Sequence, residues 1–140
     1  MKNSIYFICS GNSCRSQMAE GYAKKYLPNW DVQSAGIRAD GVNPLAIKTM
    51  ADDNIDISNQ QSTIVDKIFM KKATIVVTLC GEARDKCIIP QNSRWFHWPI
   101  DDPALITGSD VKVKAAFNNT RNEIKRDVLE LAAQLNNQTK

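Results

Sequence analysis

A cysteine and an arginine lie close together near the start of the chain, at Cys9 and Arg15. The segment between and around them contains only small or polar residues, in the order Cys9, Ser10, Gly11, Asn12, Ser13, Cys14, Arg15 and Ser16. An arginine guanidinium carries forked N–H donors that match a tetrahedral oxyanion, and a cysteine thiolate is a nucleophile. The spacing therefore predicts a site that binds an anion and attacks it.

The elements around this segment favour the same interpretation. The apolar stretch Ser4–Cys9 predicts a buried strand, and a helical pattern of apolar residues follows over residues 17–26. Amides at the start of a helix have no intrahelical partner, and they can converge on an anion. Gly11 and Asn12 tolerate the backbone angles that such a loop needs. We expect residues 10–16 to wrap the anion and to stabilise a thiolate at Cys9; the alternative is a buried cysteine beside a surface arginine.

Strand and helix patterns alternate along the rest of the chain. Strands are expected over residues 30–36, 73–80 and 94–100. Helices are expected from Pro44, over residues 64–70 and over residues 113–135, with a short helix or loop over 82–87 and a frayed tail at 136–140. The alternation predicts an α/β fold with three α/β/α layers around a four-stranded parallel sheet. Ligands bind beyond the carboxyl ends of such strands, where Cys9 and Cys80 both fall.

The composition limits the class of protein. The chain has 140 residues, which suits one domain over 1–140, and its formal net charge is +3. We see no basic run of the kind that binds nucleic acid, and no segment with the length of a membrane span or a signal peptide. We expect a cytoplasmic monomer without nucleic-acid or membrane partners. The four cysteines of such a protein are more often catalytic groups, metal ligands or buried residues than structural disulfides.

The segment CSGNSCRS (Cys9–Ser16) resembles the phosphate-binding loop of low-molecular-weight protein tyrosine phosphatases. This resemblance implies the phosphatase-like fold, and it implies that Asp102 is the general acid because those enzymes carry an Asp-Pro pair at that place. An acid on a loop beyond a strand end can protonate a leaving oxygen. The neighbouring carboxylate of Asp101 is the rival acid, and an ordinary turn aspartate is the alternative interpretation of Asp102.

Two further cysteines follow in TLCGEARDKC, at Cys80 and Cys87. Together with SAGI, GVNP, DISN, VVTLCG and DDPA, they make the chain similar to thioredoxin-coupled arsenate reductases. That resemblance implies arsenic detoxification by a three-cysteine relay. Cys9 attacks arsenate, Cys80 attacks Cys9 and releases arsenite, and Cys87 attacks Cys80. Thioredoxin then reduces the final disulfide, and Cys14 has no role beyond packing within the loop.

The chain also departs from that pattern. Ile88 follows Cys87 where the family usually has proline, and Pro99 stands where it often has glycine. Some relatives bind potassium near the active site. Asn12, Glu20 and Ser34 match part of that site, whereas Gln61 and Thr63 stand where a threonine and an aspartate are expected. The departures at Gln61 and Thr63 argue against potassium dependence, so we expect no bound cofactor. The resemblance implies thioredoxin as an external reductant.

Other functions remain open on the sequence. A plain tyrosine phosphatase would use Cys9, Arg15 and Asp102 and would not need the other cysteines. A zinc site could draw on the four cysteines and His97, although neither cysteine pair has the usual zinc spacing. A non-catalytic oxyanion sensor would bind anions without turnover. His97 could be a catalytic base, although a packing role for it is the alternative.

Overall fold

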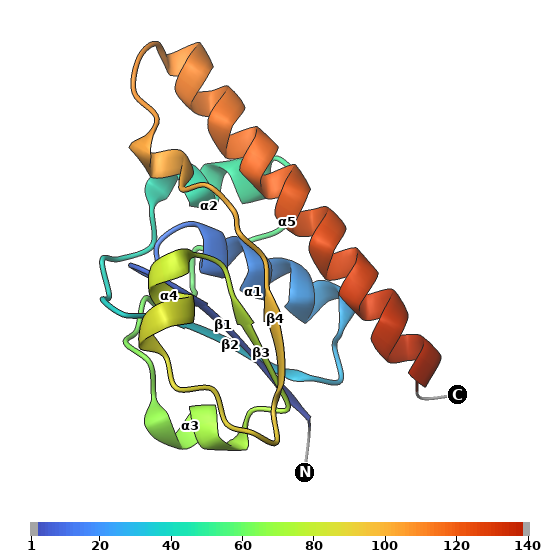
Figure 1. Ribbon diagram of the computed structural model, residues 1–140. Helices are drawn as coiled ribbons and strands as arrows, with labels where there is room; N and C mark the ends of the chain where they lie inside the picture. The colour runs from blue at the N-terminus through green and yellow to red at the C-terminus, as the bar shows by residue number, and fades with distance from the viewer. Residues whose placement is uncertain (1–2, 139–140) are drawn as a thin grey trace.

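The computed structural model describes residues 3–138, and its sheet has four strands in the order β2-β1-β3-β4. The strands are β1 (Ser4–Cys9), β2 (Asp31–Gly36), β3 (Ile75–Thr78) and β4 (Arg94–His97). All neighbouring strands are parallel, and the register pairs Cys9 with Gly36. The carboxyl ends of β1 and β2 therefore meet at one edge of the sheet, as Figure 1 shows.

Five α-helices and one short 3-10 turn connect and cover the strands within the described residues. They are α1 (Arg15–Tyr26), α2 (Pro44–Ala51), α3 (Lys67–Lys72), α4 (Gly81–Lys86), η1 (Pro103–Leu105) and α5 (Asp110–Gln138). Side chains that cap the first turn determine where several of these helices start. The Asn43 side chain accepts a hydrogen bond from the Leu45 amide at the start of α2, where Pro44 occupies the first turn.

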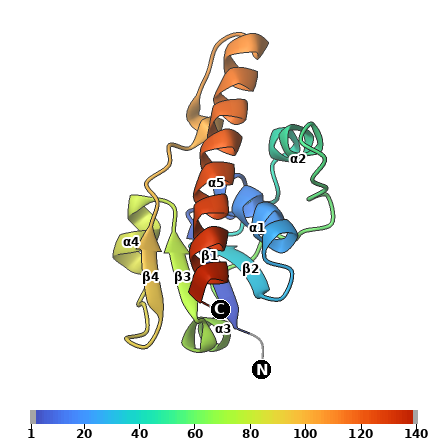
Figure 2. The ribbon, with the colours of Figure 1, turned by 90° about the vertical axis from the view of Figure 1, so that its right-hand side faces the viewer.

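Alternate residues of β1 pack into different layers, as the period of two in a strand requires. Ile5 and Phe7 belong to the core cluster that contains buried residues of α1, α2 and α5. Tyr6 and Ile8 belong to a second cluster with Met70 of α3 and residues of α4. In Figure 1, α3 and α4 lie on the side away from α5, and Figure 2 shows α5 crossing in front of the strands. The predicted three-layer α/β/α fold is confirmed.

Two sequence predictions about helices were wrong. Residues 64–70 do not form one helix: Ile64 makes a bridge to Gly36, and α3 begins only at Lys67. The reason is that the Asp66 side chain accepts from the amides at the start of α3 and so caps it there. The predicted frayed tail is also wrong for residues 136–138, which continue α5, while residues 139–140 lie outside the described part.

The last two strands are shorter than predicted, which matters for the site. β3 ends at Thr78, so that Cys80 lies at the N-cap of α4 rather than in the strand. β4 ends at His97, and an irregular segment then leads to Asp102 and η1. Within residues 3–138, no helix combines the length and the apolar character that crossing a membrane requires.

Candidate active site

Residues 9–14 form a loop whose backbone carbonyl oxygens point outward and accept hydrogen bonds from the surrounding chain. Backbone amides of segment 37–43 donate at 2.8–3.2 Å to the carbonyl oxygens of Cys9, Ser10, Gly11 and Ser13. The Gln17 side chain donates to the Asn12 carbonyl at 3.1 Å, and the Met18 amide donates to the Cys14 carbonyl at 2.9 Å. In a planar trans peptide, the N–H points opposite to the carbonyl before it. The amides of residues 10–15 are therefore directed into the loop, where they can bind an anion.

The loop packs tightly against the end of β2. Asn12 has a φ of 50°, in the left-handed region that asparagine tolerates better than most residues. A Cβ added at Gly36 would lie 2.7 Å from the Asn12 nitrogen and 2.8 Å from the Ser10 oxygen. Only glycine leaves room for this approach, so Gly36 belongs to the site. Sequence reasoning missed this role, although the glycine at the end of a strand in SAGI was a visible signal.

The thiol of Cys9 is buried at the start of the loop, with its Sγ 2.8 Å from the Ser16 Oγ. The Thr63 amide donates to the Asn12 Oδ1 at 2.8 Å, which leaves the Asn12 Nδ2 as the donor to the Ser16 Oγ at 2.7 Å. Because the Ser16 oxygen accepts that bond, its own hydrogen is left for the sulfur of Cys9. A hydrogen bond donated to the sulfur stabilises the thiolate.

Arg15 and Asp102 lie side by side, although 86 residues separate them in the sequence. The Arg15 Nη1 donates to the Ile100 carbonyl at 2.9 Å, and its Nη2 is 3.7 Å from the Asp102 Oδ2. The other oxygen of Asp102 accepts from the Ala104 amide at 3.0 Å at the start of η1. The Asp102 carboxyl is thereby held next to the guanidinium of the loop, whereas Asp101 is exposed. Sequence reasoning missed the Ile100 carbonyl, because a backbone acceptor has no residue signature.

Cys14 does not have the environment of a nucleophile. Burial raises the pKa of its thiol to about 12, and the nearby Asp102 carboxylate adds to the rise. The thiol therefore stays protonated near neutral pH. Cys14 contributes to the loop through its backbone, in agreement with its interpretation as a packing residue.

Cys80 borders the loop from the other side. Its Sγ lies 3.2 Å from the Ser10 Oγ and accepts from the Ala83 amide at 3.4 Å as the N-cap of α4. Ser10 directly follows Cys9 in the chain, so the second thiol stands next to the segment that carries the first one. The fold thus places Cys80 against the loop that begins at Cys9, 71 positions earlier in the sequence.

Cys87 lies at the opposite end of α4, where it is the C-cap. Its half-buried side chain packs against the cluster that contains Tyr6 and Met70. Burial raises the pKa of the Cys87 thiol, and the charge of Cys80 raises it further. All four cysteines are free thiols in this structure.

The polar cluster behind the loop does not fit a resident potassium ion. Its carboxylate, Glu20, accepts from the Ser34 hydroxyl at 2.6 Å and from the Lys24 ammonium at 2.5 Å. The lysine already supplies the counter-charge that a cation would bring. No group of three or more His, Cys, Asp or Glu side chains within residues 3–138 could hold a metal ion, so the zinc alternative has no ligand set there.

His97 bonds within the sheet. Its Nδ1 lies 2.8 Å from the Thr78 hydroxyl, which also accepts a hydrogen bond from the Trp95 indole at 3.0 Å. These contacts tie β4 to β3 and favour the packing role over that of a base.

Comparison with known proteins gives one consistent result. The family model of low molecular weight phosphotyrosine protein phosphatases matches residues 4–140. An arsenate reductase from Halalkalibacterium halodurans is 53% identical over 129 residues, covering 91% of this chain and 93% of that protein. An arsenate reductase from Bacillus subtilis is 51% identical over 135 residues, covering 94% and 97%.

Solved structures agree with the sequence comparison. An arsenate reductase in the phosphate binding state superposes with a TM-score of 0.77 at 32% identity, over 96% of this chain and 98% of that chain. The tyrosine phosphatase Wzb from Escherichia coli has a TM-score of 0.82 at 20% identity, over 96% and 99%, which shows the shared fold alone. With a matching family model and relatives that share half of its residues, the chain belongs to the low molecular weight phosphotyrosine protein phosphatase family.

Proposed function

We propose that this enzyme reduces arsenate to arsenite with three thiols in series, Cys9, Cys80 and Cys87, and that thioredoxin restores them. The observation that carries the proposal is the position of Cys80, whose sulfur lies 3.2 Å from the Ser10 hydroxyl at the edge of the oxyanion loop. A phosphatase has no use for a second thiol there. The relatives that share about half of this chain's residues are arsenate reductases.

In the first step, the Cys9 thiolate attacks the arsenic atom, and a sulfur–arsenic bond forms. One arsenate oxygen leaves as water after it takes a proton from the Asp102 carboxyl. Arg15 and the inward amides of the loop stabilise the negative charge that builds up on the remaining oxygens. Arsenic is still pentavalent in this adduct.

In the second step, the Cys80 thiolate attacks the Cys9 sulfur. The sulfur–arsenic bond breaks, its electron pair stays on arsenic, and arsenite leaves with a Cys9–Cys80 disulfide behind it. The Cys87 thiolate then attacks the Cys80 sulfur and releases Cys9 as a thiolate. The two electrons that reduce arsenic thus come from a pair of thiols.

The geometry of α4 requires a rearrangement during the last transfer. Cys80 and Cys87 are seven positions apart across the helix, which at a rise of about 1.5 Å per residue separates their Cα atoms by roughly 10 Å. A disulfide needs Cα atoms within about 7 Å. At least part of α4 must therefore unwind. A helix of 6 residues is marginal by itself, so unwinding it costs little.

The final Cys80–Cys87 disulfide requires a reductant that donates two electrons. A dithiol protein of the thioredoxin type supplies them by thiol–disulfide exchange. Because thiols stay reduced in the cytoplasm, we propose that the enzyme acts there. We propose that it acts as a monomer.

The test is arsenate-dependent oxidation of NADPH in the presence of thioredoxin and thioredoxin reductase. The wild-type protein should turn over continuously. Cys87→Ser should release about one equivalent of arsenite and stop, with a Cys9–Cys80 disulfide that peptide mass analysis detects. Hydrolysis of p-nitrophenyl phosphate, which needs Cys9 but neither Cys80 nor Cys87, should persist in this variant and serves as the folding control.

A phosphatase without reductase activity is the second candidate, and the placement of Asp102 beside Arg15 supports it. It predicts no arsenate-dependent oxidation of NADPH and equal phosphatase activity in the wild type and in Cys87→Ser. That result would overturn the reductase proposal.

A further inference from the structure

One arginine holds both sides of the contact between Cys80 and Ser10. The Arg38 amide donates to the Ser10 carbonyl at 2.8 Å, on the side of the oxyanion loop. The Arg38 guanidinium extends to α4, where its Nη1 lies 3.4 Å from the Glu82 Oε1. Glu82 is in the first turn of α4, two positions after Cys80. Arg38 therefore connects the loop that carries Ser10 with the helix that begins at the second thiol.

The Arg38 guanidinium is held on its other side by Asp40. Its Nη2 lies 3.3 Å from the Asp40 Oδ2, and the Asp40 amide donates to the Gly11 carbonyl at 2.9 Å. The Asp40 carboxylate lies directly against Gly11, because a Cβ added at Gly11 would overlap with it. The guanidinium thus has an anchor that is itself bonded to the oxyanion loop.

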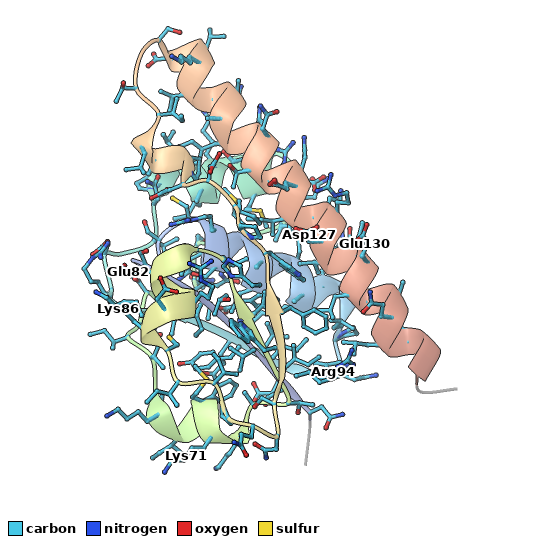
Figure 3. All side chains as sticks on the ribbon, viewed as in Figure 1. Lys71, Glu82, Lys86, Arg94, Asp127 and Glu130 are labelled. Atoms are coloured by element: carbon cyan, nitrogen blue, oxygen red, sulfur yellow. The ribbon has the colours of Figure 1, made fainter. Side chains whose placement is uncertain are left out.

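Both oxygens of the Glu82 carboxylate take part in ion pairs. Its Oε1 faces Arg38, and its Oε2 lies 3.3 Å from the Lys86 ammonium in the last turn of α4. Figure 3 shows Glu82 and Lys86 projecting from α4 on the side away from α5. A hydrogen bond from the Ser10 side chain, as the largest cause, and then Lys86 lower the pKa of the Glu82 carboxyl, which is therefore ionised near neutral pH. The ion pairs thus extend from the oxyanion loop to the residue before Cys87.

We infer that Arg38 is a positioning residue for the second thiol. It keeps the start of α4 against the oxyanion loop, so that Cys80 stays beside Ser10 while Cys9 carries the substrate. The inference rests on the proposed function and adds to it a residue outside the three cysteines and the oxyanion loop.

The ion pair between Arg38 and Glu82 acts in opposite directions on two successive steps. The attack of Cys80 on Cys9 gains from a thiol that is already held near its target. The transfer to Cys87 requires at least part of α4 to unwind, and the ion pair opposes this motion because it ties down the first turn. A general structural defect would instead slow both steps.

The expected effects are modest in size. The side chain of Arg38 is 56% exposed and that of Glu82 is 31% exposed, so water and salt screen their attraction. Exposed ion pairs of this kind change an equilibrium by about two- to fivefold. Since α4 has only 6 residues and is marginal by itself, a change of this size alters how often the helix unwinds.

The experiment follows a single turnover of arsenate without any external reductant. Samples are quenched at intervals by alkylation, and peptide mass analysis measures the two disulfides of the relay. The variants are Arg38→Gln, which removes the charge, and Arg38→Lys, which keeps it. Arg84→Gln is the matched control, because Arg84 forms an ion pair with the next residue within α4, at 2.9 Å.

In Arg38→Gln, the first disulfide should form about two- to fivefold more slowly, and its conversion into the second should be about two- to fivefold faster. Arg38→Lys should restore most of both rates, and Arg84→Gln should match the wild type. Once Glu82→Gln is present, Arg38→Gln should have no further effect, since the two residues act as one pair. High salt should change the wild type in the same two directions and affect Arg38→Gln less.

The equilibrium between dithiol and disulfide gives an independent measurement. In a dithiothreitol redox buffer, the Cys80–Cys87 disulfide should be about two- to fivefold more favoured in Arg38→Gln than in the wild type. The reason is that the ion pair stabilises the dithiol form, in which α4 is folded. An equal equilibrium in the two proteins would contradict the inference.

Unchanged rates of both steps in Arg38→Gln would overturn the inference and leave the relay intact. A change of both steps in the same direction would also overturn it. Slowing of both steps with an equal loss of p-nitrophenyl phosphate hydrolysis would assign Arg38 to the oxyanion loop as a whole. If the wild type forms neither disulfide with arsenate, the proposed function itself fails, and this outcome differs from the others.

Discussion

The Asn12 side-chain amide donates to the Ser16 hydroxyl at 2.7 Å, while the Thr63 amide holds the opposite end of the same side chain. A backbone N–H can only donate, so the orientation of Asn12 follows from its partner. The Ser16 hydrogen then faces the Cys9 sulfur, 2.8 Å away. The backbone amide of Thr63 thus determines, through Asn12 and Ser16, which hydrogen bond reaches the sulfur of Cys9.

Asn12→Asp should weaken the nucleophile. The carboxylate cannot donate to Ser16, it faces the Thr63 amide as before, and its charge opposes the Cys9 thiolate. We expect kcat/KM for p-nitrophenyl phosphate to fall about 10- to 100-fold, which corresponds to the loss of a hydrogen bond to a charged group. Asn92→Asp, in an exposed turn, is the control, and equal values of kcat/KM in the two variants would contradict the orientation argument.

Asp102→Asn should remove the general acid while leaving anion binding intact. We expect kcat to fall by about two to three orders of magnitude with little change in KM. The loss should be larger for phenyl phosphate than for p-nitrophenyl phosphate, because the poorer leaving group depends more on protonation. Asp101→Asn changes the rival carboxylate and should retain most of the activity. A reversed order of the two variants would assign the acid role to Asp101.

The transfer from the Cys9–Cys80 disulfide to the Cys80–Cys87 disulfide should accelerate as pH rises. Burial raises the pKa of the Cys87 thiol above its ordinary value, so the thiol is mostly protonated near neutral pH. Because the thiolate is the attacking form, the rate should increase about tenfold per pH unit below that pKa. Rapid alkylation followed by peptide mass analysis measures each disulfide. A pH-independent transfer would show that α4 unwinding, rather than deprotonation, limits this step.

Gly36→Ala should displace the oxyanion loop. The added Cβ would lie 2.7 Å from the Asn12 nitrogen, and backbone on both sides cannot move away easily. We expect the free energy of unfolding to fall by about 1–3 kcal/mol and the affinity for inorganic phosphate to decrease. Gly81→Ala is the matched control, since its Cβ would meet only the Arg84 guanidinium at 3.6 Å. Normal phosphate affinity in Gly36→Ala would contradict the close approach of β2 to the loop.

Potassium should have no specific effect on the wild-type protein. The Lys24 ammonium already bonds the buried Glu20 carboxylate, so the melting temperature should be equal in potassium and sodium chloride at the same ionic strength. Lys24→Met removes this counter-charge. We expect it to lower the free energy of unfolding by roughly 0.5–1 kcal/mol, since the lysine is half exposed, while Lys48→Met has no effect. A potassium-specific stabilisation of the wild type would show that a cation binds despite the lysine.

The features that depend on local patterns could be predicted from the amino-acid sequence. The strand Ser4–Cys9, the oxyanion loop after it and the long C-terminal helix were all predictable. The spacing of apolar residues, the run of small residues and the helix-forming residues each indicate local structure within a few positions. The errors also arose locally. The helix α3 was predicted to start at residue 64 but starts at Lys67. The Asp66 side chain caps the helix there, and this cap outweighed the apolar pattern.

Contacts between groups that are distant in the sequence became visible only in the folded structure. The pairing of Arg15 with Asp102 and the contact of Cys80 with Ser10 depend on the strand order β2-β1-β3-β4, which no local pattern encodes. The Thr63 amide and the Ile100 carbonyl act through the backbone, so residue type could not reveal them. A groove lined by Ile64, Met70 and Cys87 exists because α3 and α4 pack on the same face of the sheet. Such a surface forms only when the helices and the sheet assemble.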